Sequence, residues 1–302
     1  MTNLHLQNVN LTSNTGPNCF GRKLFDALGD KGVTFNVYEE PTATLAFIES
    51  TRQPVVGGLY QRLDGIYFNS SENYSEQNRL IKKTYDNATG VIFQSEFNKK
   101  LTTHFFGEHP HSIVIHNGAN LKQIDKLPHN ISNIQDRYEK VWCCASHWRP
   151  HKRLEENIEY FMKYSGTKDI LLIAGEVKNK PIENPRVKYL GNIKYHYLLA
   201  ILKSCDYFIH LAWLDHCPNV VVDARACGCK IICSSSGGTK EVAGLGATII
   251  DEDEWNLAPV KLYEPPKLDF TKQSINEYNI SYDMEWVSQK YLDFMISPRT
   301  IQ

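Results

Sequence analysis

The chain has 302 residues, of which 42% are hydrophobic and 22% charged, and its formal net charge at pH 7 is -1. This composition is typical of a globular protein with room for two domains, and it gives no reason to expect nucleic acid as a partner. No stretch approaches the ~18 apolar residues that a membrane span needs. Residues 1–10 lack the basic and apolar regions of a signal peptide. We therefore expect a cytoplasmic protein without a transmembrane span.

Short apolar runs alternate with amphipathic stretches in the first half of the chain, which predicts βα units and a parallel sheet. We expect helices at residues 19–31, 74–87 and 95–106. Strands are expected at residues 4–9, 34–37, 54–61, 90–94 and 112–116. The polar segment 121–139 then breaks the pattern, so we expect it to link two domains.

The alternation restarts after this segment and predicts a second α/β domain. Its helices are expected at residues 154–165, 195–203 and 219–226, and its strands at residues 140–145, 170–174, 187–190, 207–211, 230–233 and 247–250. The organisation predicts two doubly wound domains, residues 1–138 and 139–281, with a cleft between them. Ligands bind such sheets beyond the carboxyl ends of the strands, so polar residues that follow strands are the site candidates.

The segment 215–230 follows the strand expected at 207–211 and is the richest in polar groups. Pro218 suits the first turn of a helix. The backbone amides after it and the positive end of the helix dipole favour the binding of a diphosphate. Asp215 precedes this helix and Asp223 lies about one turn into it. A capped helix with a loop aspartate is the alternative, and the spacing alone favours it.

Two further segments carry charge at the ends of expected strands. Residues 146–153 are rich in Lys, Arg and His and directly follow a strand, so they are either an anion clamp or a solvated basic loop. Arg62 and Asp64 are either a substrate contact or a buried structural ion pair. The acidic run 251–254 is interpreted as a solvated loop, because the chain shows no isolated metal-binding motif.

Seven segments, taken in order and spacing, are far more specific than any one of them. They are residues 62–65, 91–97, 114–118, 148–154, 171–175, 187–191 and 215–241. Together they resemble the retaining glycosyltransferases of the GT-B fold, in particular the family 4 group, also called glycosyl transferases group 1. The resemblance covers most of the chain. It implies two Rossmann-like domains, with the donor nucleotide on the C-terminal one, the acceptor on the N-terminal one, and the final helix 282–295 packed back on the N-terminal one.

The resemblance also assigns site residues. The E-x7-E motif of the family falls on Asp215, which faces the transferred sugar, and on Asp223, which holds the ribose. The basic pair of the family falls on His147 and Lys152, with Arg149 beside them as a permanent cation. The implied donor contacts are Gly16, His147, Arg149, Lys152, Gly191, Pro218, Asn219, Val220 and Asp223. The implied catalytic residues are Asp215, Lys152 and Asp64, and the acceptor-side residues are Arg62 and Asp64.

The expected function is the transfer of a sugar from a UDP- or GDP-sugar to an acceptor hydroxyl, with retention of configuration. A Lys/Arg clamp and a helix N-terminus neutralise the leaving diphosphate in this scheme, so we expect neither a metal nor another cofactor. The acceptor, which could be a glycan, a lipid or a protein, and any peripheral membrane contact stay open. The alternatives are a nucleotide-sugar epimerase, a sugar phosphorylase, or a degenerate nucleotide-sugar-binding module, which two aspartates in place of glutamates would suit.

Overall fold

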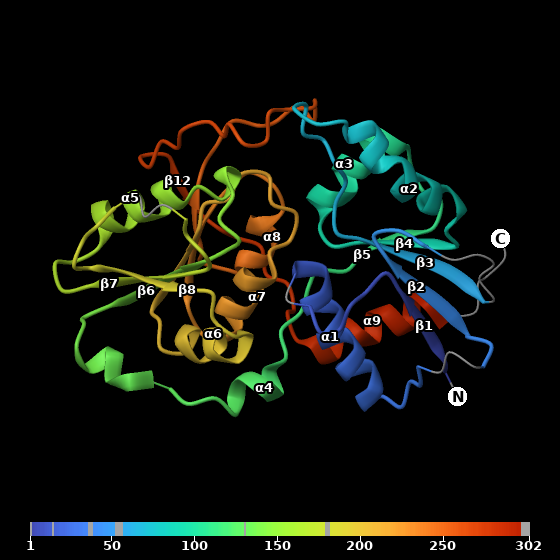
Figure 1. Cartoon of the computed structure of the whole chain (residues 1–302), viewed down its shortest axis with the longest axis horizontal. Coiled ribbons are helices and arrows are strands. Elements are labelled where there is room, and N and C mark those ends of the chain that lie inside the picture. The colour runs from blue at the N-terminus through green and yellow to red at the C-terminus, as the bar shows by residue number, and fades with distance from the viewer. Residues whose placement is uncertain are drawn as a thin grey trace. The chain divides into compact units, whose positions relative to one another are not determined.

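The computed structural model describes residues 2–13, 15–35, 39–51, 57–129, 131–178 and 182–296. The chain divides into two compact units, each built on its own sheet (Figure 1). The first unit comprises Met1–Ala119, Leu257–Val260 and Ser281–Gln302, and the second comprises Asn120–Asn256 and Lys261–Ile280.

The first unit contains a parallel sheet in which the described strands lie side by side in chain order. The strands are β1 (Leu4–Gln7), β2 (Ala43–Phe47), β3 (Gly58–Leu63), β4 (Gly90–Phe93) and β5 (Ser112–Val114). β2 and β4 are buried along their whole length, as expected for parallel strands covered by helices. Thr34 forms a parallel bridge with Asn3. The rest of the strand expected at 34–37 falls largely outside the described residues.

Four helices of the first unit cover this sheet (Figure 1). They are α1 (Gly16–Asp30), α2 (Tyr74–Asn87), α3 (Glu96–Phe106) and α9 (Met284–Ile296). Asn73 and Ser95 cap α2 and α3, because each side chain accepts a hydrogen bond from the backbone amide three residues later. The last helix, α9, packs against α1, and the rings of Phe20 and Tyr291 lie 5.9 Å apart.

The second unit contains a sheet with the order β12-β11-β10-β9-β6-β7-β8. The strands are β6 (Val141–Ala145), β7 (Ile170–Ala174), β8 (Val187–Gly191), β9 (Tyr207–His210), β10 (Lys230–Ser234), β11 (Thr248–Ile250) and β12 (Gln273–Ile275). All are parallel except β12, which pairs antiparallel with β11. Without β12, the order is that of the doubly wound Rossmann sheet, and it reverses between β6 and β9.

The described helices of the second unit include four that the sequence pattern did not predict as helices. The α-helices are α4 (Leu121–Asp125), α5 (Leu154–Tyr164), α6 (Tyr195–Leu202), α7 (Asn219–Ala226) and α8 (Thr239–Ala243), and the 3-10 helices are Ile131–Asp136 and Pro150–Lys152. Two of them, α4 and Ile131–Asp136, lie in the segment expected to be an irregular link.

The division between the units differs from the boundary suggested at 138/139, because it falls after Ala119. The buried ammonium of Lys203 donates to the carbonyls of Ile124 and Leu127 at 2.9 and 2.7 Å, and these bonds fasten α4 to the second unit. Val260 pairs with residues of the first unit, since its amide donates to Phe68 O at 3.1 Å. Residues 257–260 therefore belong with the first unit, although they lie far along the chain.

Candidate functional site

The order of the second sheet fixes where its ligand site lies. The chain passes from β6 outward to β7 and β8, then returns to β9 beside β6 and continues the other way. β6 and β9 are neighbours, but the connections that follow them lead to opposite sides of the sheet. This place is therefore the topological switch point of the fold. A hydrogen bond of 2.7 Å from Trp213 N to His151 O joins the two loops. The basic segment 146–153 thus meets the loop after β9 that carries Asp215.

Lys152, His210 and Asp215 form a connected cluster at this place, and we call it the switch-point triad. The ammonium Nζ of Lys152 lies 2.5 Å from Oδ2 of Asp215, and Nε2 of His210 lies 2.9 Å from the same oxygen. The other carboxylate oxygen, Oδ1, accepts the amide of His216 at 3.0 Å. The side chains of Lys152 and Asp215 are 17% and 16% exposed, so the cluster reaches the surface only in part.

The electrostatics of the triad keep Asp215 ionised. Burial alone would raise its pKa, but the charge of Lys152 and the hydrogen bond from His210 bring that pKa well below its ordinary value. Burial also lowers the pKa of His151 to about 3 and that of His216 to about 4. Both rings are therefore neutral at physiological pH, and Lys152 supplies the positive charge of the cluster.

The loop that carries Asp215 is fixed by the glycine pair after β10. Gly238 N donates to Asp215 O at 2.8 Å, and Gly237 has a φ of +79°. A Cβ atom added to Gly237 would lie 2.4 Å from Asp215 O, so a larger residue would push the carboxylate out of place.

Arg153 does not contribute to an anion clamp, although it belongs to the basic segment. Its side chain is fully buried, and its guanidinium donates to Glu252 at 2.6 Å and to Pro266 O at 2.8 Å. The interpretation of residues 251–254 as a solvated loop is wrong for Glu252, whose side chain is 7% exposed. His147 and Arg149 are exposed in the same segment as Lys152, so Arg149 offers an anion a second permanent positive charge.

Asp223 lies on α7, and its side chain is buried against α6. The hydroxyl of Tyr195 donates to Asp223 Oδ2 at 3.0 Å. Pro218 precedes the helix and has no N–H, and Val221 N already donates to Pro218 O at 3.1 Å. Asn219 and Val220 are the first two residues of α7, and their position keeps them candidates for a phosphate contact. Neither Tyr195 nor His210 was predicted from the sequence.

The remaining donor candidates are glycines. Gly191 ends β8 with a φ of +66°, and its carbonyl accepts the amide of Gly175 at 2.9 Å. It lies at the carboxyl end of its strand, on the same edge of the sheet as the triad. Gly16 is the first residue of α1 in the first unit and is exposed.

Arg62 and Asp64 form the buried ion pair that was the alternative to a substrate contact. Arg62 is fully buried and also donates to Tyr291 Oη at 3.1 Å and to Asn117 Oδ1 at 2.7 Å. Its guanidinium lies 4.1 Å from the centre of the Phe20 ring. Arg62 therefore ties β3 to α1 and α9. Asp64 is 15% exposed, and burial raises its pKa despite the neighbouring Arg62.

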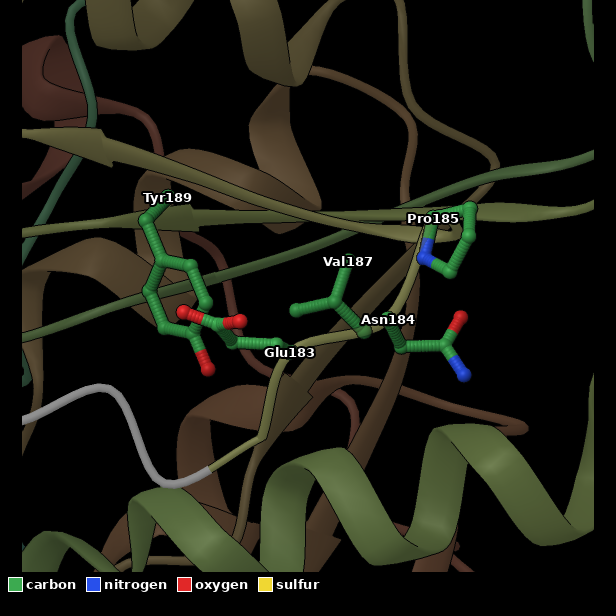
Figure 2. Close-up of a pocket in the computed structure, with 5 residues that line it drawn as sticks. All are labelled: Glu183, Asn184, Pro185, Val187 and Tyr189. Atoms are coloured by element: carbon green, nitrogen blue, oxygen red, sulfur yellow. The ribbon is translucent and has the colours of Figure 1, made fainter.

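A surface hollow of the second unit lies away from these residues. It is lined by Glu183, Asn184, Pro185, Val187 and Tyr189, which come from β8 and the segment before it (Figure 2). The hollow adjoins the start of edge strand β8, whereas the triad follows the ends of β6 and β9. Parallel strands place these ends on opposite edges of the sheet, so the hollow is not part of the candidate site.

No group of three or more His, Cys, Asp or Glu side chains in the described ranges is arranged to hold a metal ion. Among the helices that the structure describes, none is both long enough and apolar enough to cross a membrane.

Comparisons with known proteins agree with this architecture. HepE of Anabaena, solved in complex with UDP and glucose, is 14% identical with a TM-score of 0.68, over 99% of this chain and 100% of that chain. WaaG, a glycosyltransferase involved in lipopolysaccharide biosynthesis, is 10% identical with a TM-score of 0.61, over 98% and 100%. Sucrose-phosphate synthase from Thermosynechococcus elongatus is 13% identical with a TM-score of 0.58, over 84% and 87%. No curated protein matches by sequence.

The fold is thus that of the GT-B glycosyltransferases, with two Rossmann-like units, and this prediction is confirmed. Residues 129–258 match the family model described as Glycosyl transferases group 1. The resemblance to this family is therefore also confirmed, and the matched segment contains Lys152, His210, Asp215 and Asp223.

Proposed function

We propose that the protein transfers a sugar from a nucleotide-diphosphate sugar to an acceptor hydroxyl, and that the second unit binds the donor. The observation that carries the proposal is the switch-point triad, which sets the ammonium of Lys152 beside the loop that leads into α7. A diphosphate at this place meets a permanent cation and the amides of a helix N-terminus. Asp223, one turn into α7, is suited to accept hydrogen bonds from the ribose hydroxyls.

The proposed reaction runs without a metal and with retention of configuration. Negative charge grows on the leaving diphosphate as the bond to the sugar breaks. Lys152 and exposed Arg149 neutralise it, and exposed His147 is placed to donate a hydrogen bond. A UDP-sugar is the first donor to test, because HepE was solved with UDP and glucose. Retention rests on the resemblance to the retaining family, and Asp64 in the first unit remains a proposed acceptor-side contact.

A ligand panel tests the donor site directly. Purified protein is heated with UDP, GDP, ADP and their common sugars, and a ligand that binds the native state raises the melting temperature. At a ligand concentration of roughly 100 times Kd, the stabilisation is about 2.7 kcal/mol. The anomeric configuration of the product is then read by NMR. A panel in which no nucleotide shifts the melting temperature contradicts the proposed donor site, and binding without transfer favours a binding module.

A further inference from the structure

Asp215 accepts hydrogen bonds from two side chains on one oxygen. Lys152 reaches Oδ2 from the loop after β6, and His210 reaches it from the end of β9. An ionised carboxylate only accepts hydrogen bonds, so Nε2 of His210 carries a hydrogen and its tautomer is fixed. His210 is 5% exposed and belongs to a strand, whereas Lys152 has a flexible stem and is 17% exposed. Lys152 is therefore the partner of Asp215 that can move.

The arrival of a diphosphate changes the balance of charge around Asp215. If the ammonium of Lys152 turns to the phosphates, the carboxylate loses its cation while it stays mostly buried, and an unpaired buried charge is costly. His210 remains at 2.9 Å and can restore the pairing by becoming an imidazolium. The proton adds to Nδ1, because Nε2 already donates to Asp215.

We propose that His210 takes up a proton from solvent when the diphosphate of the donor draws Lys152 away from Asp215, so that donor binding is coupled to proton uptake. The inference rests on the proposed function. It makes His210 a positioning residue, which holds Asp215 in both states of the site but carries a charge only in the occupied one.

The charges that face His210 support this direction. Burial lowers the pKa of His210 and the ammonium of Lys152 lowers it further, while the hydrogen bond and charge of Asp215 raise it. Movement of Lys152 toward the ligand removes a lowering contribution, and the negative diphosphate adds a raising one. Two more arginines follow β6: Arg149 is exposed and acts on His151, and Arg153 is paired with Glu252.

Two other buried histidines of the site, His151 and His216, are poorer proton acceptors. His151 stacks on Tyr263 with ring centres 5.6 Å apart, and among the described residues its buried Nδ1 has no hydrogen-bond partner. Its pKa is lowered to about 3. His216 has a pKa lowered to about 4, and its backbone amide makes the bond to Asp215. His210 is thus the histidine whose ring contacts the carboxylate that Lys152 would leave.

Calorimetry with UDP-glucose tests the coupling in wild-type protein. A nucleotide sugar is preferred to UDP, because its phosphates carry no group that titrates near neutral pH. The binding enthalpy is measured in buffers of different ionisation enthalpy, all at a pH of about 7. This pH is chosen because a histidine can change its charge there. We expect it to vary with the buffer in the sense of proton uptake. The affinity should fall as pH rises, by at most about tenfold per pH unit for one proton.

Three variants identify the residue. His210→Gln keeps an amide donor near Asp215 but cannot take a proton, so it should bind UDP-glucose without uptake and with a flatter pH profile. His196→Gln, an exposed histidine of α6, should behave as wild type. His151→Gln should retain the uptake. If His210→Gln does not fold, as judged by its melting curve, His210→Asn replaces it.

The outcomes separate the two proposals. If neither UDP-glucose nor GDP-mannose binds the wild-type protein, the proposed donor site is wrong. The proposed coupling to His210 is then wrong as well, because it depends on that site. If one binds and the enthalpy does not depend on the buffer, the donor site stands and the coupling to His210 is refuted. Uptake that survives in His210→Gln also refutes it, because the proton then goes to another residue, which is His151 if the uptake disappears in His151→Gln.

Discussion

Replacement of Lys152 by methionine tests the centre of the proposed donor site, because it removes the ammonium and keeps most of the stem. A hydrogen bond to a charged group contributes about 1.5–3 kcal/mol. Lys152 is only 17% exposed, so screening by solvent reduces this value little. The loss corresponds to a fall in kcat/KM for the donor of roughly 10- to 150-fold. A larger fall would show that the contact strengthens in the transition state.

The same substitution changes stability in a pH-dependent way. Removal of one partner of a buried pair costs about 3–5 kcal/mol, and the remaining bond from His210 to Asp215 reduces this cost. Because Lys152 helps to depress the pKa of Asp215, the stabilisation is present above the unfolded pKa of about 3.9 and is lost as pH falls through the folded value. The melting temperatures of variant and wild type should therefore converge only in strong acid.

Donor kinetics and thermal melts measure both effects. Lys168→Met is the matched control, since Lys168 also pairs with a carboxylate, Glu139 at 3.1 Å, but both side chains are largely exposed. This control should change neither kcat/KM nor the melting temperature appreciably. An unchanged kcat/KM in Lys152→Met, with normal melting, would refute the assigned role of Lys152.

Three further predictions follow from the same contacts. Asp223→Asn should weaken binding of the nucleoside diphosphate and the sugar donor alike. Asp215→Asn should not weaken diphosphate binding, because it removes the carboxylate that competes for Lys152, but it should lower kcat. Calorimetry and steady-state kinetics on both variants measure the two effects. Transfer should survive EDTA, and loss of activity that Mg²⁺ or Mn²⁺ restores would contradict charge neutralisation by Lys152. Arg62→Met should lower the free energy of unfolding by about 3–5 kcal/mol in denaturant titration, because it leaves Asp64 without its buried partner.

The sequence predicted the main strands because parallel strands covered by helices on both faces consist of short apolar runs. It missed β2, in which two of five residues are alanines of weak β-propensity, and β12, an exposed edge strand of Gln, Ser and Ile. These strands are formed by pairing with neighbours: β2 lies between β1 and β3, and β12 adds to β11. Local pattern alone could not reveal either.

The sequence singled out Lys152 and Asp215 as site candidates but could not show that they meet. Lys152 and Asp215 lie 63 positions apart, so only the strand order shows that they meet. Lys152 and Arg153 are adjacent and equally basic in sequence, yet one faces the site and the other is buried against Glu252. His210 stands in the apolar run of β9, where a buried histidine has no signal of its own. Its position five residues before Asp215, at the end of a central strand, was the available clue.

The triad also sets a condition on any ligand of this site. Lys152 is already paired with Asp215 in the free protein, so an anion gains its ammonium only by competing with a carboxylate at 2.5 Å. A single weak anion replaces one such contact with another and gains little. A diphosphate presents two charged groups, and it can engage Lys152 together with exposed Arg149 and the amides that begin α7. We therefore expect the free site to bind ligands with two linked phosphates more tightly than ligands with a single phosphate, in keeping with the proposed nucleotide-sugar donor.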